Sequence, residues 1–219
     1  MITIRHAHKK DKNFISSSMV KASGGICEHL LSDVIVGVEP DRLLSFEVAK
    51  DSSPLSYKNC LIAEDDNASY AGIICAYDAK EFQKQLHNIP QGKRAAVDTF
   101  YTADFPLRSF YIDTVYVNER HQKKGIATQL IMHLSAFDLS NYQFLTLYVW
   151  EANQAALHLY KKLGFQILET RCSTNTDFPI NGKRLLMYCK IKVFETTVNQ
   201  LIHKGMPLLP SKINSYGMV

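Results

Sequence analysis

Runs of almost purely apolar residues alternate in this chain with segments where apolar residues recur every three or four positions. Residues 110–117 and 144–150 are nearly wholly apolar, as expected for strands that are covered on both faces of a sheet. Residues 60–63 and 70–77 are apolar as well, and the turn-forming residues 64–69 between them predict an antiparallel hairpin. The middle of the chain is therefore predicted to form a sheet.

The two ends of the chain extend this pattern. Residues 1–5 alternate like a short strand, and residues 11–19 carry apolar residues at helical spacing. Residues 26–49 are predicted to be helical or irregular, and residues 166–172 and 184–191 predict two closing strands. The chain thus opens with a strand and a helix and closes its sheet with two further strands.

Two amphipathic helices are predicted next to the most apolar strands. Ile126, Leu130, Ile131 and Leu134 recur at i, i+4, i+5 and i+8, which is one side of a helix and predicts a strand-helix-strand crossover. A second helix is predicted after Asn153, which can cap it, and before Gly164, which can end it. Its apolar stripe consists of Ala155, Ala156, Leu159, Tyr160 and Leu163. The elements together predict an α/β (mixed α+β) fold in which helices flank both faces of a mixed sheet.

Length and composition indicate one domain. With 219 residues, 46% of them hydrophobic, the chain can bury a core without metals or disulfides. We expect a single domain over residues 1–192 and a C-terminal extension over residues 193–219. The extension can pack against its own domain, dock a second copy of the chain or be loose. Residues 79–109 form an unusually long link, which is either functional or a surface elaboration.

Charge and cysteine usage argue against several classes of function. The chain has 25 basic and 21 acidic residues, and a net charge of +4 is too small to indicate nucleic-acid binding. Its five cysteines include no Cys-x-x-Cys pair and its histidines lack ligand spacing, so no metal is expected. We find no signal-like start and no apolar run long enough to cross a bilayer. A reduced, cytoplasmic protein without a membrane partner is predicted.

One loop carries the strongest candidate chemistry. Residues 117–128, with the sequence VNERHQKKGIAT, turn an apolar strand into a helix through a basic segment that contains Gly125. The first N–H groups of a helix have no partners within it, the helix dipole adds partial positive charge, and glycine lets a ligand approach closely. The loop lacks the glycine patterns of triphosphate and dinucleotide binding. We interpret it as a cradle for a pyrophosphate.

Two motifs resemble those of one protein family. The spacing Gln122-x-x-Gly125-x-Ala127 resembles the [Gln/Arg]-x-x-Gly-x-[Gly/Ala] signature of the GNAT superfamily of acetyl-coenzyme A-dependent N-acetyltransferases. Residues 147–165 resemble that superfamily's strand followed by Asn-x-x-Ala and Leu-Tyr-x-x-x-Gly-Phe. The resemblance is clear over residues 110–170 and lapses in the long link and the extension. It implies a GNAT-like, mostly antiparallel sheet of six to seven strands, with an insert between the third and fourth strands.

The resemblance implies a binding site for acetyl-coenzyme A as acyl donor. The pantetheine arm would pair with the backbone of Val115, Tyr116 and Val117, where the fourth strand splays from the fifth. An N–H group near Val117 would then face the thioester carbonyl. The predicted pyrophosphate contacts are the backbone N–H groups of Gln122, Lys123, Lys124, Gly125, Ile126 and Ala127, together with the hydroxyl of Thr128. Asn153 is interpreted as a helix cap, a contact to the pantetheine arm, or both.

The resemblance also implies a proton donor. Tyr160 matches the tyrosine that the superfamily commonly uses as general acid toward the coenzyme A thiolate. A phenol with a pKa near 10 stays protonated at neutral pH and can protonate the anion of a thiol with a pKa of about 8.5. Periodicity alone would make Tyr160 a core aromatic residue, but the motif favours the catalytic interpretation.

The proton acceptor is less well defined. Asp113 shares a face with Val115 and Val117 if strand alternation holds, and burial in an apolar strand would raise its pKa toward the range of a useful base. Asp113 can equally be a structural carboxylate that hydrogen-bonds a neighbouring loop. Tyr111 is a weaker candidate, which would order a water that carries the proton.

The preferred hypothesis is an N-acetyltransferase that acts on a primary amine of a small molecule or protein by direct attack in a ternary complex. No cysteine has a recognisable nucleophile context, so an acetyl-enzyme is not indicated. The alternative is a non-catalytic acyl-coenzyme A-binding or partner-docking module on the same fold. A third hypothesis, nucleic-acid binding by residues 120–124, is disfavoured by the small net charge. Residues 79–109 are a candidate acceptor lid, and a homodimer stays open.

Overall fold

The computed structural model describes residues 1–31, 34–87, 89, 101, 104–172 and 182–211. Within these residues, seven strands form one sheet in the order β1-β2-β3-β4-β5-β7-β6. They are β1 (Ile2–His6), β2 (Cys60–Asp65), β3 (Tyr70–Asp78), β4 (Ser109–Val117), β5 (Phe144–Trp150), β6 (Gln166–Cys172) and β7 (Lys183–Lys190). Neighbouring strands are antiparallel except for β4 and β5, which are parallel. The predicted mixed and mostly antiparallel sheet is confirmed.

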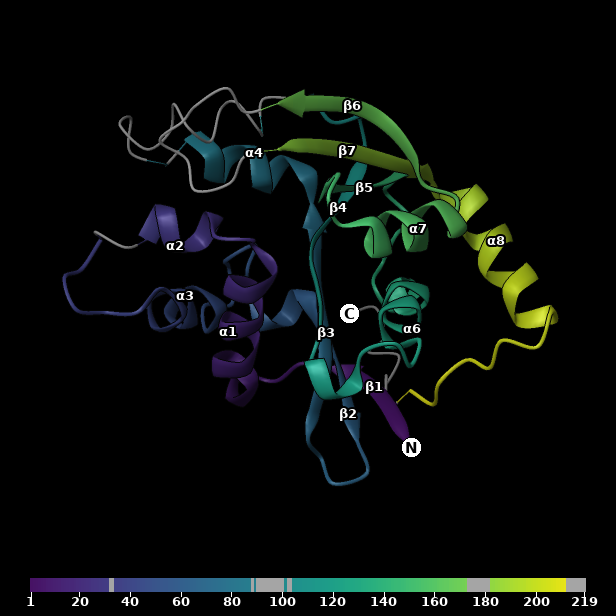
Figure 1. The fold of residues 1–219 in the computed structure, drawn as a ribbon, viewed down its shortest axis with the longest axis horizontal. Helices are drawn as coiled ribbons and strands as arrows, with labels where there is room; N and C mark the ends of the chain where they lie inside the picture. The colour runs from purple at the N-terminus through teal and green to yellow at the C-terminus, as the bar shows by residue number, and fades with distance from the viewer. Residues whose placement is uncertain (32–33, 88, 90–100, 102–103, 173–181, 212–219) are drawn as a thin grey trace.

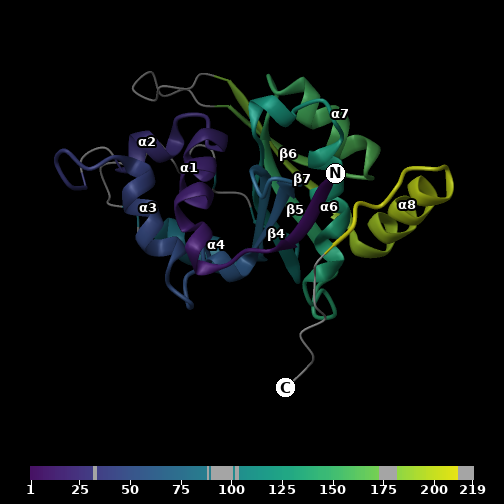
Figure 2. The ribbon, with the colours of Figure 1, turned by 90° about the horizontal axis from the view of Figure 1, so that it is seen from below.

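Helices cover both faces of this sheet (Figures 1 and 2). One face, called here the α1 face, carries α1 (Lys12–Ala22), α2 (Ile26–Leu31), α3 (Pro40–Val48) and α4 (Ala79–His87). The other, the α6 face, carries α6 (Ile126–Met132), α7 (Gln154–Lys162) and α8 (Ile191–His203). Each face buries its own apolar cluster, with Ile15, Val48 and Ile73 on the α1 face and Leu130, Leu147 and Leu163 on the α6 face.

Both predicted amphipathic helices are present with small differences. α6 ends at Met132, and a 3-10 turn, η4 (His133–Ala136), continues the predicted apolar side to Leu134. In α7 the buried stripe is Leu157, Tyr160 and Leu163, whereas Ala155 is exposed, so the predicted stripe was wrong at that position. The side chain of Asn153 caps α7 by accepting a hydrogen bond from the N–H of Ala156 at 3.1 Å, as predicted.

β4 contains one residue that has no partner in its register with β3. Cys75 of β3 lies opposite Thr114, whereas the next residue of β3 lies opposite Ile112, so Asp113 is bulged out of the pairing. A bulge shifts the alternation of side chains by one position. Ile112 and Val115 both pack on the α6 face, and Asp113 accepts a hydrogen bond from Tyr77 on the α1 face. The prediction that Asp113 shares a face with Val115 and Val117 was therefore wrong.

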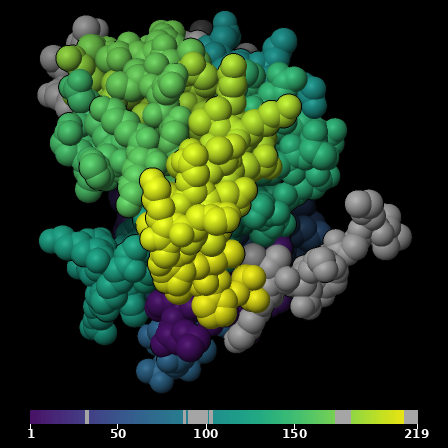
Figure 3. Space-filling model, turned by 90° about the vertical axis from the view of Figure 1, so that its right-hand side faces the viewer, coloured from purple at the N-terminus to yellow at the C-terminus, as the bar shows by residue number. Residues whose placement is uncertain are grey.

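The segment after α8 packs against the same chain. Figure 3 shows α8 and this segment running across the α6 face toward the N-terminal strand. The side-chain amide of Gln129 donates to the carbonyl oxygen of Pro207 at 2.7 Å and accepts from the N–H of Leu209 at 2.9 Å. The N–H of Ile4 donates to the carbonyl oxygen of Pro210 at 3.0 Å. Up to Ser211 the extension thus adopts the first of the three arrangements that the sequence left open.

The insert over residues 79–109 is described in part. It begins with α4, and the ring of Phe82 packs against that of Tyr111 with centroids 4.6 Å apart. Residues 88, 90–100 and 102–103 lie outside the described residues, so the role of the insert as an acceptor lid stays a prediction. None of the described helices has the length and apolar character that crossing a bilayer needs.

Candidate functional site

β4 and β5 separate part-way along their length. Their parallel pairing runs from Ser109, opposite Phe144, to Ile112, opposite Leu147. Beyond this point β4 continues to its end, but no pairing with β5 is recorded within the described chain. Residues 114–117 therefore pair with β3 on one side, and residues 113–117 leave the other backbone edge without a strand. An extended ligand can add to such an edge as a further strand.

The loop after β4 presents unpaired backbone amides to solvent. Residues 122–125 are exposed, and Lys123 and Gly125 have left-handed φ values of +59° and +77°. A Cβ added at Gly125 would meet no atom within 4 Å, so open space adjoins this backbone. The N–H of Gln129 is the first of α6 to donate, to the carbonyl oxygen of Gly125 at 3.1 Å. Among the described residues, the amides of residues 123–128 have no backbone acceptor, which is what an anion site requires.

The side chains of the loop surround these amides. Lys124 Nζ donates to the carbonyl oxygen of Arg120 at 3.0 Å, and Gln122 Nε2 donates to the carbonyl oxygen of Val117 at 3.3 Å. Ile126 is 2% exposed and its side chain belongs to the core, so only its backbone can meet a ligand. The side chains that remain partly exposed at the start of α6 are those of Ala127 and Thr128.

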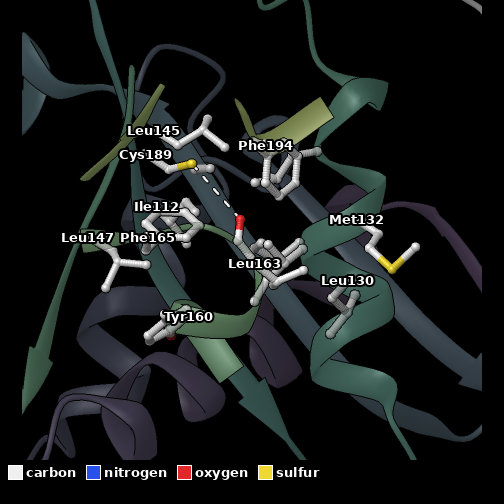
Figure 4. Packing of buried hydrophobic residues seen from close by; sticks show 14 of the residues in the cluster. Ile112, Leu130, Met132, Leu145, Leu147, Tyr160, Leu163, Phe165, Cys189 and Phe194 are labelled. Carbon is white, nitrogen blue, oxygen red and sulfur yellow. Dashed lines mark hydrogen bonds between the residues drawn. The ribbon is translucent and has the colours of Figure 1, made fainter. Parts of the chain in front are cut away.

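Tyr160 lies on the α6 face. Its side chain is 8% exposed and packs against Phe165 with ring centroids 5.8 Å apart. Figure 4 shows it at the margin of the buried cluster, with Leu163 farther in. Burial raises the pKa of Tyr160 to about 12, so the phenol is protonated at neutral pH. No hydrogen bond of its hydroxyl to any described residue is recorded, and the group is therefore free to donate to a ligand.

Asp113 lies on the α1 face, at the point where β4 leaves β5. Its half-buried carboxylate accepts hydrogen bonds from the hydroxyls of Tyr77 at 2.9 Å and Thr114 at 2.7 Å. Burial raises the pKa of Asp113, although these hydrogen bonds and the charge of Arg184 oppose the rise. A carboxylate with a raised pKa is a stronger base than an ordinary one. Tyr111, the weaker candidate, is 2% exposed and its ring forms part of the core.

Sequence reasoning missed a buried cation on the same face. Arg184 of β7 is 8% exposed and lies opposite Trp150 in the strand register. Its guanidinium carbon is 4.1 Å from the ring centroid of Tyr101, 5.1 Å from that of Tyr148 and 5.0 Å from that of Trp150. Its Nε and Nη1 atoms have no hydrogen-bond partner within the described part of the chain. The signal in the sequence was a cation at the start of an otherwise apolar strand.

The arrangement places the two candidate proton-transfer residues on opposite faces of the sheet. Tyr160 lies in the apolar cluster of the α6 face, which also carries the exposed amide loop. Asp113, on the α1 face, directly follows Ile112, the last residue of β4 that pairs with β5. No group of three or more His, Cys, Asp or Glu side chains that could hold a metal occurs among the described residues.

Comparison with known proteins identifies related sequences and folds. The model of the acetyltransferase (GNAT) family matches residues 39–165, which is more than half of the chain. No curated protein matches the sequence. A solved acetyltransferase is 24% identical, covering 86% of this chain and 98% of its own, with a TM-score of 0.63.

Two further solved structures share the fold. An N-acetyltransferase from Staphylococcus aureus Mu50 is 20% identical over 85% of this chain and 99% of its own, with a TM-score of 0.62. The protein yncA from Salmonella typhimurium, solved with its cofactor acetyl-CoA, is 18% identical over 87% of this chain and 94% of its own, with a TM-score of 0.54. At these identities the likeness concerns the fold.

Proposed function

We propose that this chain, which belongs to the acetyltransferase (GNAT) family and has acetyl-coenzyme A as its acyl donor, transfers the acetyl group to a primary amine of a small molecule or protein. The amine attacks the thioester directly while both substrates are bound. The observation that carries this proposal is the unpaired edge of β4 over residues 113–117, which leads into the exposed amide loop before α6.

The donor binds along this edge. The backbone of Val115, Tyr116 and Val117 pairs with the pantetheine arm, and the amides of residues 122–127 with the Thr128 hydroxyl bind the pyrophosphate. The side chains of Lys123 and Lys124 make the electrostatic potential around the loop more positive, which favours an anion. Asn153, at the junction of β5 and α7, lies at the end of β5 that has separated from β4, where its exposed side chain can meet the same arm.

The chemistry divides between the two faces. As the amine nitrogen bonds to the acetyl carbon, its proton passes to Asp113 or, through water, to solvent. The carbon–sulfur bond breaks, and the Tyr160 hydroxyl protonates the departing thiolate and then regains a proton from solvent. An N–H of the β4 edge near Val117 stabilises the oxyanion between these steps. The products are an N-acetyl amine and the free thiol of coenzyme A.

Direct attack is supported by the protonation state of two of the five thiols. Burial raises the pKa of Cys27 to about 12 and that of Cys189 to about 11, so both are protonated at neutral pH. Because the thiolate is the nucleophilic form, these residues are poor acceptors of an acetyl group. A ternary complex needs no such acceptor.

The test is a turnover experiment on the purified chain with acetyl-coenzyme A and a panel of primary amines. We expect free thiol and N-acetyl product in equal amounts, intersecting initial-rate patterns and no acetylated protein by mass spectrometry. Reaction without amine gives the background hydrolysis rate. Parallel rate patterns, a stable acetyl-protein or acetylation of hydroxyls alone would each contradict the proposal.

A further inference from the structure

We infer that the acceptor carries a carboxylate in addition to its amine, and that Arg184 binds this carboxylate. The inference rests on the proposed function, because it names which amines the site takes. It starts from the side chain that the proposed chemistry does not use: a guanidinium on the α1 face, 8% exposed, among three aromatic rings.

Burial leaves Arg184 incompletely satisfied. Removing a guanidinium from water is unfavourable unless an anion or hydrogen bonds compensate. The rings of Tyr101, Tyr148 and Trp150 offset part of this cost through cation–π contact. Ring faces do not accept the in-plane N–H groups, and the donors on Nε and Nη1 have no acceptor among the described residues. A carboxylate supplies a negative charge and two coplanar oxygen atoms, which match the planar, forked arrangement of guanidinium N–H donors.

Among the described residues, no neighbouring carboxylate supplies this anion. Asp113 is held by Tyr77 and Thr114, and no ion pair of Arg184 is recorded in the described chain. Arg171, which lies opposite Arg184 in the register, is 2.5 Å from the carboxylate of Glu169. Within the described residues these carboxylates are thus already engaged, and Nε and Nη1 of Arg184 keep donors that a ligand can use.

Asp113 and Arg184 together favour a zwitterion. Both belong to the α1 face, and the charge of Arg184 is felt at the Asp113 carboxyl group. An amine directed to Asp113 for deprotonation can therefore direct a carboxylate on the same molecule to Arg184. An acceptor with a second cation at that position would instead meet like charge in a poorly solvated site, which is unfavourable. α-Amino acids have the required combination, whereas simple diamines lack it.

The first test uses the unaltered chain. Each L-amino acid is compared with its primary amide, which keeps the amine and side chain but lacks the negative charge. We expect kcat/KM for at least one acid to exceed that of its amide by about 10-fold or more, the effect of one charge-assisted hydrogen-bonding group. Equal or better turnover of the amides across the panel would overturn the inference while leaving the proposed N-acetylation intact.

The second test uses Arg184→Gln and Arg184→Lys, with Lys183→Gln as matched control. Lys183 is the exposed neighbour on β7, so its substitution removes the same charge from the adjacent position of the strand. Arg184→Gln should lower kcat/KM for the preferred acid about 100-fold and change that of the amide by less than about 3-fold. Arg184→Lys should recover part of the loss, because it restores charge without the planar fork. Equal losses for acid and amide would contradict the assignment.

A binding readout separates this inference from turnover. Trp150, whose ring is 5.0 Å from Arg184, is the single tryptophan of the chain, so its fluorescence reports on this position. N-Acetyl-L-amino acids, which resemble products and cannot react, should change this fluorescence saturably, and their amides should not. If no amine is acetylated, the proposed function fails, yet this titration still decides whether Arg184 binds a carboxylate. Identical responses to acids and amides would exclude it.

Discussion

Tyr160 is buried and Asp113 is half-buried, and burial raises the pKa of each with opposite chemical consequences. A phenol whose pKa rises stays protonated over a wider range and acts as a donor. A carboxylate whose pKa rises holds an accepted proton more tightly and is a stronger base. The two residues therefore suit the acid and base roles on the two sides of the split.

Replacing the Tyr160 hydroxyl tests the acid role. Tyr160→Phe keeps the ring that packs on Phe165, so the fold and coenzyme binding should persist while kcat falls about 100-fold, the lower range for a general acid. Steady-state kinetics should show KM for acetyl-coenzyme A within about 3-fold of the unaltered value. Tyr57→Phe, at an exposed hydroxyl bonded to Asp51, is the control that should change neither constant. Full activity of Tyr160→Phe would remove the residue from the mechanism.

The raised pKa of Asp113 predicts a pH dependence. The base must be ionised to accept a proton, so kcat/KM should fall as pH drops through the pKa of Asp113, and this limb should lie above the ordinary value of 3.8. Asp113→Asn should abolish this acidic fall in kcat/KM. It should leave the part of the pH profile that reflects deprotonation of the substrate amine. The pH profiles of both proteins, measured with the same amine, check this. An unchanged profile in Asp113→Asn would show that the proton leaves by another route.

For single residues, the sequence predicted which residue types matter better than it predicted the sheet face on which each side chain lies. The cap at Asn153 was predicted because its motif spacing is local to one strand-helix junction, and the acid role of Tyr160, from the same motif, stays a prediction. The face of Asp113 was wrong because the extra residue in β4 depends on pairing with β3, which a strict alternation does not contain. Arg184 was missed because it meets Tyr148 and Trp150 only through the pairing of β7 with β5.

Among the elements, the turn from β4 into α6 determines how the donor is held. Gly125 caps α6 with φ of +77°, a conformation that residues with a Cβ rarely adopt. Open space adjoins the position, so the consequence of a substitution there comes from backbone strain and from loss of close approach rather than from a clash. The amides that follow this residue are the proposed pyrophosphate contacts.

Gly125→Ala should therefore weaken the donor site. The strained φ costs about 1 kcal/mol, and displacement of the loop amides should raise the Kd for coenzyme A about 10-fold in a calorimetric titration. Gly205→Ala is a matched control, because Gly205 follows α8 with φ of +89° and also has open space at the Cβ position. It should show a similar loss of stability without a change in Kd. Equal effects of the two variants on Kd would argue against the loop.

The helices and strands could be predicted from the sequence because each buries one or both of its faces in the core, and this burial sets the spacing of its apolar residues. The nearly uninterrupted apolar strands β4 and β5 are covered on both faces, as predicted. The order β5-β7-β6 and the point where β4 leaves β5 depend on long-range pairing, which no local pattern encodes. The resemblance to a family implied the separation of β4 from β5, but the sequence did not predict this strand order.

Across the whole molecule, one buried ionic network joins the first strand to the α1 face. Asp11 is 1% exposed and accepts hydrogen bonds from Arg5 at 2.8 Å, from the N–H of His8 at 2.7 Å and from the hydroxyl of Tyr70 at 2.8 Å. Arg5 also donates to Glu64 of β2 at 2.7 Å. The network thus connects β1, β2, β3 and the start of α1.

This network predicts how stability depends on pH. Burial alone would raise the pKa of Asp11, but the hydrogen bonds from Arg5, His8 and Tyr70 hold it below its ordinary value. The stabilisation is therefore complete above the unfolded pKa of about 3.9 and is lost as pH falls through the lower folded value. Asp11→Asn should lower the free energy of unfolding at pH 7 by about 3 kcal/mol, because it leaves Arg5 partly unpaired.

Urea denaturation at pH 7 and at pH 3 measures this difference. The stability of Asp11→Asn should decline less on acidification than that of the unaltered chain. Asp51→Asn, which removes an exposed partner of Lys58, should have little effect at either pH. A parallel acid response of the unaltered and Asp11→Asn proteins would show that the network does not set the pH dependence.

Hydrogen–deuterium exchange with and without coenzyme A tests the central claim most directly, since the claim concerns backbone amides. Saturating coenzyme A should slow exchange in residues 113–117 and 122–128 and leave the β1–β2 edge of the sheet unchanged. Binding that protects another surface, such as the exposed side of α8, or that leaves both segments unprotected, would contradict the account.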